Sequence, residues 1–259
     1  MQVYDSATDS WTLAPNVPVP LNHTMAAGGN GKVYVIGGQS SAAGNGPFLD
    51  TVFAFDPATA TWISRAPMPT ARGGGAAAVM DGKIYVVGGR PPAGNDFAVY
   101  DPLLDAWTTL PDLPTQRNHL AAVAVGGKLY VIGGRFGAGF QSEMTDAVEV
   151  FDPQTNTWAT GLPMPTVRGG LNAVVVNGCV HVFGGEGPGG VFPQHEAYDP
   201  VTGTWFPFAD MATPVHGVTG AATLNGWIHL PGGGTEVGGS SGSTLHQVVQ
   251  VEMVCGGSE

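Results

Sequence analysis

Charged residues, and cationic residues above all, are scarce in this chain. Its 259 residues include 20 acidic and only 9 basic ones, so charged residues make up 11%, against about 25% in an average domain. The formal net charge is −11. Nucleic acid is held without sequence preference by a basic face that neutralises phosphates, and anionic membranes attract basic clusters. The composition therefore predicts neither nucleic acid nor a membrane as a partner.

Long apolar runs and stretches free of glycine and proline are also lacking. No run of about 18 apolar residues occurs, so no membrane-spanning helix is predicted. The 41 Gly and 21 Pro leave little room for a helical bundle, because both residues disfavour helix interiors. Only two cysteines occur, Cys179 and Cys255, which allow at most one disulfide and do not fix its state. Since 43% of the residues are hydrophobic, disorder is excluded, and a compact all-β protein with tight turns remains.

A repeat runs along the whole chain. A Gly-Gly doublet follows a short apolar run five times, in steps of 51, 45, 51 and 48 residues, and an aromatic-Asp pair and a tryptophan recur in step with it. The doublets are Gly37-Gly38, Gly88-Gly89, Gly133-Gly134, Gly184-Gly185 and Gly232-Gly233. The tryptophans are Trp11, Trp62, Trp107, Trp158 and Trp205. Asp-Pro after the aromatic residue is turn chemistry, so each period holds four short strands, lettered a to d here in chain order.

A period near 50 residues with four strands is typical of a β-propeller blade. The doublet after strand b, the spaced Tyr and Trp, and the arginine that opens strand a resemble the Kelch family of β-propellers. The resemblance covers essentially the whole chain, so residues 1–259 are predicted to form one all-β Kelch-type propeller domain. The scaffold by itself implies little about function, because it hosts many.

The repeats leave two closures of the ring open. The segment around Trp11 supplies a strand d without a blade of its own, and residues 216–254 supply strands a, b and c. If these pair with one another, the ring has five blades and its sheet edges are covered. The alternative is a six-bladed propeller truncated upstream of Met1. We expect five blades, and a monomer.

Cationic and titratable side chains are predicted to gather at one mouth of the central channel. Strands a and b are antiparallel, so the start of a and the end of b share one face, together with the b–c loops. The residues expected there are Arg72, Arg117, Arg168 and His216, sixteen positions before each doublet; Asn22 and Asn118; His23, Gly74, His119, Gly170 and Val218; and Arg90, Arg135, Glu186, His195 and His246 in the b–c loops. His181 and His229 take the place of tyrosines in strand b and are interpreted as packed structural residues. The three lysines begin strand b and belong to the opposite face.

Two kinds of role are open for these residues. Arg72, Arg117 and Arg168 can hold a neighbouring carbonyl or the Asp that opens strand c, which is a structural role, or they can bind ligand. The Asn22-His23 and Asn118-His119 pairs replace Gly-Gly in the intervening repeats. The resemblance to Kelch domains of ubiquitin-ligase adaptors implies ligand-contacting side chains at these four positions.

Glu186 is a lone carboxylate in this ring of Arg and His. A Glu directly after the doublet is similar to bacterial Kelch-type sialic-acid mutarotases, but the Arg expected shortly afterwards is absent from residues 187–192. The first hypothesis is therefore a binding module that recognises an acidic peptide or an anionic glycan at the mouth. The alternative is an enzyme of the sugar-acid mutarotase, epimerase or lyase kind, with Glu186 as acid or base. No cofactor is predicted, and no metal site either, because His195, His216 and His246 lack close ligand spacing.

Overall fold

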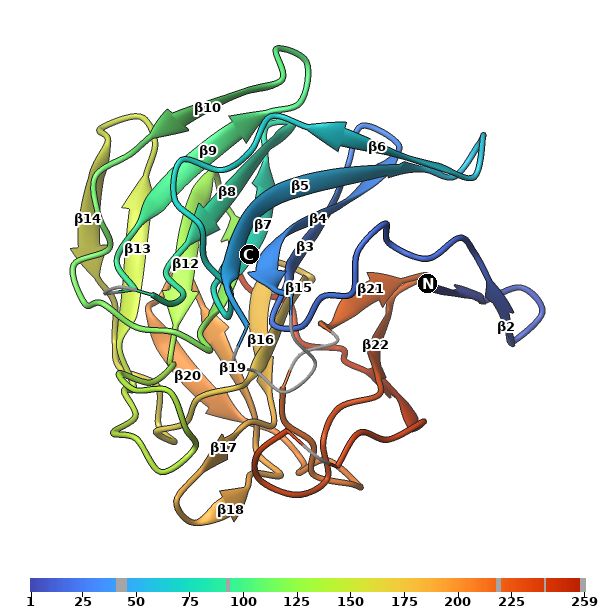
Figure 1. Ribbon diagram of the computed structural model, residues 1–259. Helices are drawn as coiled ribbons and strands as arrows, with labels where there is room; N and C mark the ends of the chain where they lie inside the picture. Colours follow the sequence, from blue (N-terminus) through green and yellow to red (C-terminus); the bar gives the residue numbers. More distant parts are fainter. Residues whose placement is uncertain (41–45, 92–93, 218–219, 240, 257–259) are drawn as a thin grey trace.

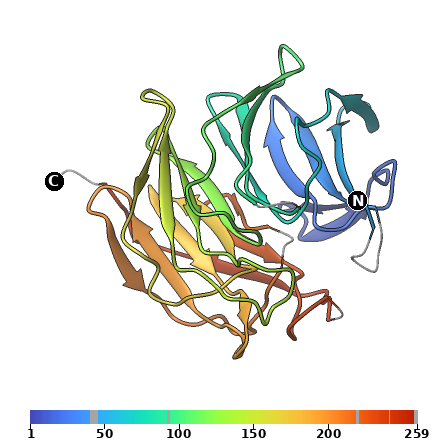
Figure 2. The same cartoon turned by 60° about the vertical axis from the view of Figure 1, so that its left-hand side comes forward.

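The fold is an all-β propeller whose sheets follow one another around a central axis (Figure 1). The computed structural model describes residues 1–40, 46–91, 94–217, 220–239 and 241–256. The turned view shows the sheets in sequence order, from the blue strands of the first blade to the orange and red strands of the last two (Figure 2). Within the described residues, no helix has the length and apolar character needed to cross a bilayer. The predicted fold class is confirmed.

Four blades have four antiparallel strands each, in the predicted order from a to d. Blade 1 is β3 (Met25–Gly29), β4 (Lys32–Gln39), β5 (Phe48–Asp56) and β6 (Thr61–Arg65). Blade 2 is β7 (Ala76–Met80), β8 (Lys83–Val87), β9 (Phe97–Asp101) and β10 (Ala106–Thr109). Blade 3 is β11 (Ala121–Val125), β12 (Lys128–Ile132), β13 (Val148–Asp152) and β14 (Thr157–Thr160). Blade 4 is β15 (Asn172–Val176), β16 (Cys179–Phe183), β19 (His195–Asp199) and β20 (Thr204–Pro207), with a small hairpin of β17 (Glu186–Gly187) and β18 (Gly190–Val191) in its b–c loop.

Two smaller sheets complete the described structure. Blade 5 has strands a to c only, as β21 (Ala222–Leu224), β22 (Trp227–Pro231) and β23 (His246–Gln250). At the N-terminus, β1 (Gln2–Asp5) and β2 (Ser10–Leu13) form a separate two-stranded hairpin. The prediction that the Trp11 strand completes blade 5 is wrong, because β2 pairs with β1. The two strands are joined by a short turn and pair with Tyr4 opposite Trp11. Pairing with this neighbour costs less loop-closure entropy than pairing with a distant strand of blade 5.

Turn chemistry and apolar alternation explain the individual blades. The predicted c–d turns are present: the carboxylates of Asp56, Asp101, Asp152 and Asp199 each accept a hydrogen bond from the backbone N–H two residues on. The b strands alternate their side chains between the two neighbouring blades, so apolar residues are needed on both faces. Four hydrophobic clusters form in this way, one at each junction from blade 1 to blade 5. The innermost strands β3, β7, β11, β15 and β21 contact one another in that order and line the channel.

The N-terminal hairpin occupies a sixth place in the ring, between blade 5 and blade 1. In blades 2 to 4 the tryptophan of strand d donates its indole N–H to a carbonyl just after strand d of the preceding blade. Trp62 of blade 1 donates in the same way to Pro15, two residues after the hairpin. On the other side, the ring of Tyr4 lies 5.6 Å from that of His229 of blade 5, as the ring of Tyr100 in blade 2 lies 5.9 Å from that of Tyr34 in blade 1. The hairpin therefore supplies strands c and d of a sixth position (Figure 1).

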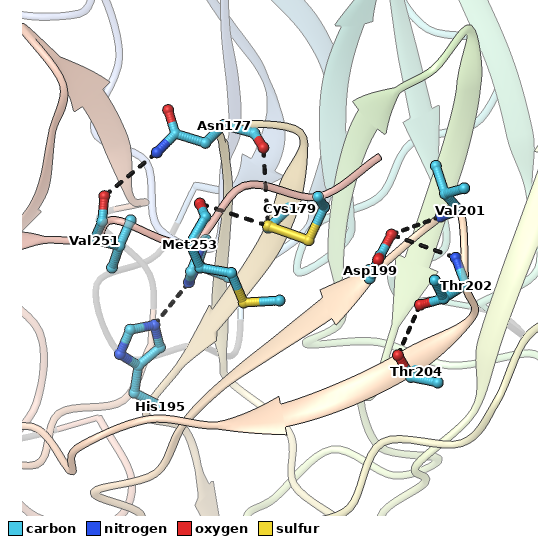
Figure 3. Close-up of a disulfide and its surroundings, with 11 residues drawn as sticks. Asn177, Cys179, His195, Asp199, Val201, Thr202, Thr204, Val251 and Met253 are labelled. Carbon is cyan, nitrogen blue, oxygen red and sulfur yellow. Dashed lines mark hydrogen bonds between the residues drawn. A yellow bond between two sulfur atoms is a disulfide. The ribbon is translucent and has the colours of Figure 1, made fainter. Parts of the chain in front are cut away.

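A disulfide ties the segment after β23 to blade 4. Cys179, the first residue of β16, bonds to Cys255 across 76 residues of chain (Figure 3). Both sulfurs lie at the face opposite the b–c loops, where Lys32, Lys83 and Lys128 begin the equivalent strands and pair with Asp56, Asp101 and Asp152. The disulfide thus holds blade 5 against blade 4 at the position where blade 4 lacks a lysine.

Candidate functional site

The channel mouth is built where strand b ends and strand a begins. In each blade the residue after the Gly-Gly doublet forms a backbone bridge to the start of strand a. The bridged pairs are Asn22 with Gln39, Gly73 with Arg90, Asn118 with Arg135, Gly169 with Glu186, and His216 with Gly234. The prediction that His216 is the counterpart of Arg168 is therefore wrong by one residue. Blade 5 has one residue more than blade 4 between this bridge and the a–b turn, and Val215 takes the arginine position.

A belt of backbone hydrogen bonds joins the five blades at the residue after this bridge. The N–H groups of Gly74, His119, Gly170 and Gly217 donate to the carbonyls of His23, Gly74, His119 and Gly170 over 2.6–2.8 Å. All five belt residues have positive φ, 51° at His23 and 54° at His119. Val218, the residue expected here in blade 5, lies outside the described residues, and Gly217 takes the position. Glycine in the alternate repeats is thus explained by a left-handed backbone, which histidine adopts more readily than most residues.

The two Asn-His pairs present neutral imidazoles at the mouth. His23 Nδ1 lies 2.9 Å from Asn22 Oδ1, and His119 Nδ1 lies 2.6 Å from Asn118 Oδ1, so each amide oxygen accepts the imidazole N–H. The two rings approach to 5.1 Å edge to face. Burial, with the charges of Arg90 and Arg135, lowers the pKa of His23 to about 4, and burial holds the pKa of His119 well below its usual range. Both rings are uncharged at neutral pH.

Gly74 makes room for these two rings. A Cβ built on Gly74 would lie 3.3 Å from the His119 ring and 3.8 Å from the His23 ring. The positive φ of 68° adds backbone strain for any other residue. The alternation of His and Gly around the belt therefore has a steric cause as well as a conformational one.

Two arginines bring positive charge to the mouth. Arg90 Nη2 lies 3.4 Å from His23 Nε2, and its guanidinium lies 5.8 Å from the centre of the Phe48 ring. Arg90 and Arg135 both donate to the carbonyl of Ala138 over 3.3 Å. Burial and the neighbouring charge of Arg135 lower the pKa of Arg90. Among the described residues, Arg90 is the one arginine without a carboxylate partner, since the other five each pair with Asp or Glu.

Glu186 is held on three sides. Its Oε1 accepts from Arg135 Nη1 at 2.7 Å, its Oε2 accepts from the N–H of Gly238 at 2.8 Å, and His216 Nδ1 lies 3.4 Å from Oε2. Glu186 is only 3% exposed. Both oxygens accept hydrogen bonds from the protein, Arg135 compensates the charge, and the residue is nearly closed to solvent. Glu186 is therefore better suited to a structural role, in which it orients Arg135, than to a role as an acid or base acting on a substrate.

Three arginines predicted as possible ligand contacts are buried inside the blades. Arg117 donates to the carbonyls of Gly133 and Val131 and pairs with Glu149 at 2.5 Å. Arg168 does the same with Gly184 and with Glu196 at 2.6 Å, and Arg72 lies 3.5 Å from Asp96. None of the three side chains reaches solvent, so their expected ligand-binding role is replaced by the structural one. The Asp predicted as a partner is correct for Arg72, whereas Arg117 and Arg168 use a Glu within strand c.

His195 and His246 do not lie at the mouth either. His195 Nε2 lies 2.9 Å from His181 Nδ1 inside blade 4, with its ring stacked on Phe183 at 3.9 Å. His246 forms the same pair with His229 in blade 5 and contacts Tyr4 at 4.6 Å. His181 is packed, as predicted. In the part of the chain that the structure describes, no three His, Cys, Asp or Glu side chains come together as a metal site.

Comparison with known proteins agrees with this geometry. Residues 1–134 match the model of the KLHDC2/KLHL20/DRC7 Kelch-repeats domain, and residues 116–165 match the Kelch motif. The chain belongs to the Kelch-repeat family. Kelch-like protein terF of Aspergillus terreus is 35% identical over 279 residues, which cover 96% of this chain and 57% of that protein. Mouse Kelch-like protein 35 is 29% identical over 215 residues, 83% of this chain and 27% of that protein.

A solved structure shows the same Kelch-type fold. The structure of YjhT superimposes with a TM-score of 0.80 at 19% identity, over 94% of this chain and 85% of that one. The chain spans between about a quarter and somewhat more than half of the length of the two curated relatives above. Kelch-repeat domains of Kelch-like proteins are generally protein-binding modules, which fits a Kelch chain whose polar mouth carries two arginines.

Proposed function

We propose that this chain is a Kelch-type binding module that holds an acidic peptide segment at the channel mouth. The observation that carries the proposal is Arg90, a half-buried guanidinium whose hydrogen-bond partners are a carbonyl at 3.3 Å and a neutral imidazole at 3.4 Å. A carboxylate is a better partner than either, because hydrogen bonds between ionised groups are shorter and about twice as strong as neutral ones. Burial at the mouth reduces screening by solvent.

Arg135 extends the site toward blade 4. The guanidiniums of Arg90 and Arg135 both donate to the carbonyl of Ala138, an exposed residue in the b–c loop of blade 3. A ligand carboxylate that replaces this carbonyl bridges Arg90 and Arg135 and relieves their mutual repulsion. Asn22 and His23 lie beside the arginines and are partly exposed, so a bound peptide can contact them, whereas their counterparts Asn118 and His119 are buried. The chain as a whole has a net charge of −11, whereas the mouth carries the cationic side chains of Arg90 and Arg135. Anionic ligands are therefore attracted to the mouth and repelled elsewhere on the surface.

Peptide binding by fluorescence anisotropy tests this function. A short Glu- and Asp-rich peptide is expected to bind, its Gln and Asn version to bind much more weakly, and the affinity to fall as ionic strength rises. Arg90→Ala should weaken binding by about tenfold or more. Arg65→Ala is the matched control, because Arg65 ends β6, away from the mouth, and pairs with Asp105.

Two results would count against the proposal. Equal affinity of the wild type and Arg90→Ala would show that the mouth is not the site. Tight binding of sialic or uronic acids in place of acidic peptides would assign the same arginines to an anionic glycan instead.

A further inference from the structure

His216 brings a titratable side chain to the mouth at a position where the other blades carry Asn or Gly. It forms the backbone bridge of blade 5 with Gly234, and 7% of the residue is exposed. Its Nε2 lies 2.7 Å from the backbone carbonyl oxygen of Glu236. A carbonyl oxygen accepts hydrogen bonds and cannot donate them, so Nε2 is the nitrogen that carries the proton in the neutral ring.

The other nitrogen of the His216 ring faces the carboxylate of Glu186. His216 Nδ1 lies 3.4 Å from Glu186 Oε2. In the neutral ring, Nδ1 presents a lone pair to an oxygen that also presents lone pairs, which is unfavourable. A proton on Nδ1 turns this contact into a charge-assisted hydrogen bond, while Nε2 keeps its bond to the carbonyl of Glu236. The surroundings of His216 are therefore already arranged for its imidazolium form.

The charged and titratable groups around His216 come from three blades. Glu186 lies in β17 of blade 4, and Glu236 is an exposed residue of the b–c loop of blade 5. His119 of blade 3 also acts on His216 through its charge state, but burial and the charge of Arg135 hold the pKa of His119 well below its usual range. Arg135 itself binds Oε1, the opposite oxygen of the Glu186 carboxylate. Glu186 is thus the direct ionic partner of His216.

The charge of Glu186 acts across the whole mouth. Burial and the charge of Arg90 lower the pKa of His23 to about 4 in blade 1, and the charge of Glu186 acts on the same ring in the opposite direction. Glu186 also occupies Arg135, so it opposes the binding of an external carboxylate in two ways. A cation that compensates Glu186 therefore leaves both arginines more available to an anion.

We propose that a proton taken up by His216 at Nδ1 strengthens the binding of acidic ligands at the mouth. The proton comes from solvent and forms the ion pair with Glu186, which raises the net positive charge of the mouth by one unit. An acidic peptide therefore binds more tightly as the pH falls from 8 to 5.5, the range in which histidine ordinarily changes its charge and carboxylates remain ionised. This inference rests on the acidic-peptide function proposed above and adds its regulation by pH.

Fluorescence anisotropy of the Glu- and Asp-rich peptide at pH 8 and pH 5.5, at constant ionic strength, tests the regulation. The affinity of the wild type is expected to rise by about fivefold, the low end of the usual coupling between linked sites. His216→Gln keeps a donor for the carbonyl of Glu236 but takes up no proton, so its affinity should be equal at both pH values. His246→Gln is the matched control, because His246 lies in the same blade and pairs with His229. It should retain the rise.

Two further measurements follow the proton itself. Because linkage between two sites is reciprocal, peptide binding at pH 6.5 should be accompanied by proton uptake. Calorimetry in two buffers of different ionisation enthalpy measures this uptake, which His216→Gln should abolish. In the free protein, NMR should show the Hε1 resonance of His216 titrating at a lower pH in Glu186→Gln than in the wild type, because loss of the carboxylate disfavours the imidazolium.

The possible failures are distinguishable. Equal affinity of the wild type at pH 8 and pH 5.5 would overturn the regulation and leave the acidic-peptide function standing. A rise in affinity that His216→Gln retains would also overturn it, because another group would then take up the proton. Absence of peptide binding at both pH values would overturn the proposed function, and the regulation with it. An NMR titration of His216 that Glu186→Gln leaves unchanged would overturn the proton site independently of any peptide.

Discussion

Arg135 of blade 3 and Glu186 of blade 4 form an ion pair across the blade boundary at the channel mouth, with 2.7 Å between Nη1 and Oε1. The two residues follow the Gly-Gly doublets of successive repeats, so the repeat register places them side by side. Glu186 also competes with any external carboxylate for Arg135. Substitution of Glu186 therefore distinguishes a structural role beside Arg135 from an acid-base role in catalysis.

Glu186→Gln should tighten the binding of acidic peptides several-fold while it lowers stability. The amide keeps a hydrogen-bond acceptor but removes the charge that occupies Arg135, so more of the guanidinium is offered to ligand. Breaking a buried charged pair costs about 1–3 kcal/mol when a hydrogen bond survives, measurable by urea unfolding. Glu236→Gln, an exposed acid close to the mouth, is the control for net charge. Weaker peptide binding, or loss of a sugar-acid conversion that the wild type performs, would instead support an acid-base role for Glu186.

Arg117→Ala and Arg90→Ala should give opposite profiles. Arg117→Ala leaves Glu149 buried without its partner and should cost about 3–5 kcal/mol of unfolding free energy, with peptide affinity unchanged at a temperature where the variant is folded. Arg90→Ala should cost affinity and little stability, since no carboxylate is left unpaired. Thermal unfolding and anisotropy on the same two samples check both halves. A loss of affinity in folded Arg117→Ala would contradict its structural role.

Repetition explains how much of this structure the sequence predicts. Blades 1 to 4 each repeat the same doublet, Asp turn and tryptophan, and blade 5 repeats the doublet, so these copies fix the strand order. The face shared by Arg90, Arg135 and Glu186 follows from antiparallel pairing. Failures occur where one copy departs from the others. An additional residue after Gly217 shifts His216 by one position, and the β1–β2 hairpin pairs locally rather than with blade 5.

Side-chain direction is the second source of error. Arg72, Arg117 and Arg168 lie just before strand a at the mouth face, yet their long side chains turn back into the blade. Those of Arg72 and Arg117 reach carbonyls of strand b, and that of Arg168 reaches the carbonyl of Gly184, directly after strand b. Position along the strand predicts the face, but it does not predict whether a guanidinium points to the channel or to the core. The available signal was the carboxylates of Glu149 and Glu196 in the middle of predicted strands c, because a buried acid requires a buried cation.

Stability should fall as the pH drops below about 6.5, the ordinary histidine value. Burial lowers the pKa of His181 to about 4 and that of His195 to about 3, so the folded protein keeps both rings neutral while the unfolded chain takes up protons. The stabilisation is fully present above pH 6.5 and is lost as the pH falls toward 4, with about 2 kcal/mol lost per histidine at pH 5. Urea unfolding at pH 7 and pH 5 measures it.

A paired substitution tests the cause of this acid sensitivity. His181→Tyr with His195→Phe reproduces the residues of blade 2, Tyr85 and Phe97, which occupy the same cross-strand places. The double variant should retain about 2–4 kcal/mol more of its stability at pH 5 than the wild type does. An unchanged difference between pH 7 and pH 5 would assign the acid sensitivity to other groups, of which His119 is the next buried candidate.

Reduction of the Cys179–Cys255 bond should loosen blade 5. The bond closes a loop of 76 residues and fixes the segment after β23 to the start of β16 (Figure 3). A cross-link of this span contributes about 2–4 kcal/mol by restricting the unfolded chain, so reductant should lower the urea midpoint by that equivalent. The double variant Cys179→Ala/Cys255→Ala should show the same lower midpoint with or without reductant. Blade 5 has only three described strands and one neighbouring full blade, so hydrogen exchange in the reduced protein should rise first in β21, β22 and β23. Uniform exchange across all blades would contradict a local role for the disulfide.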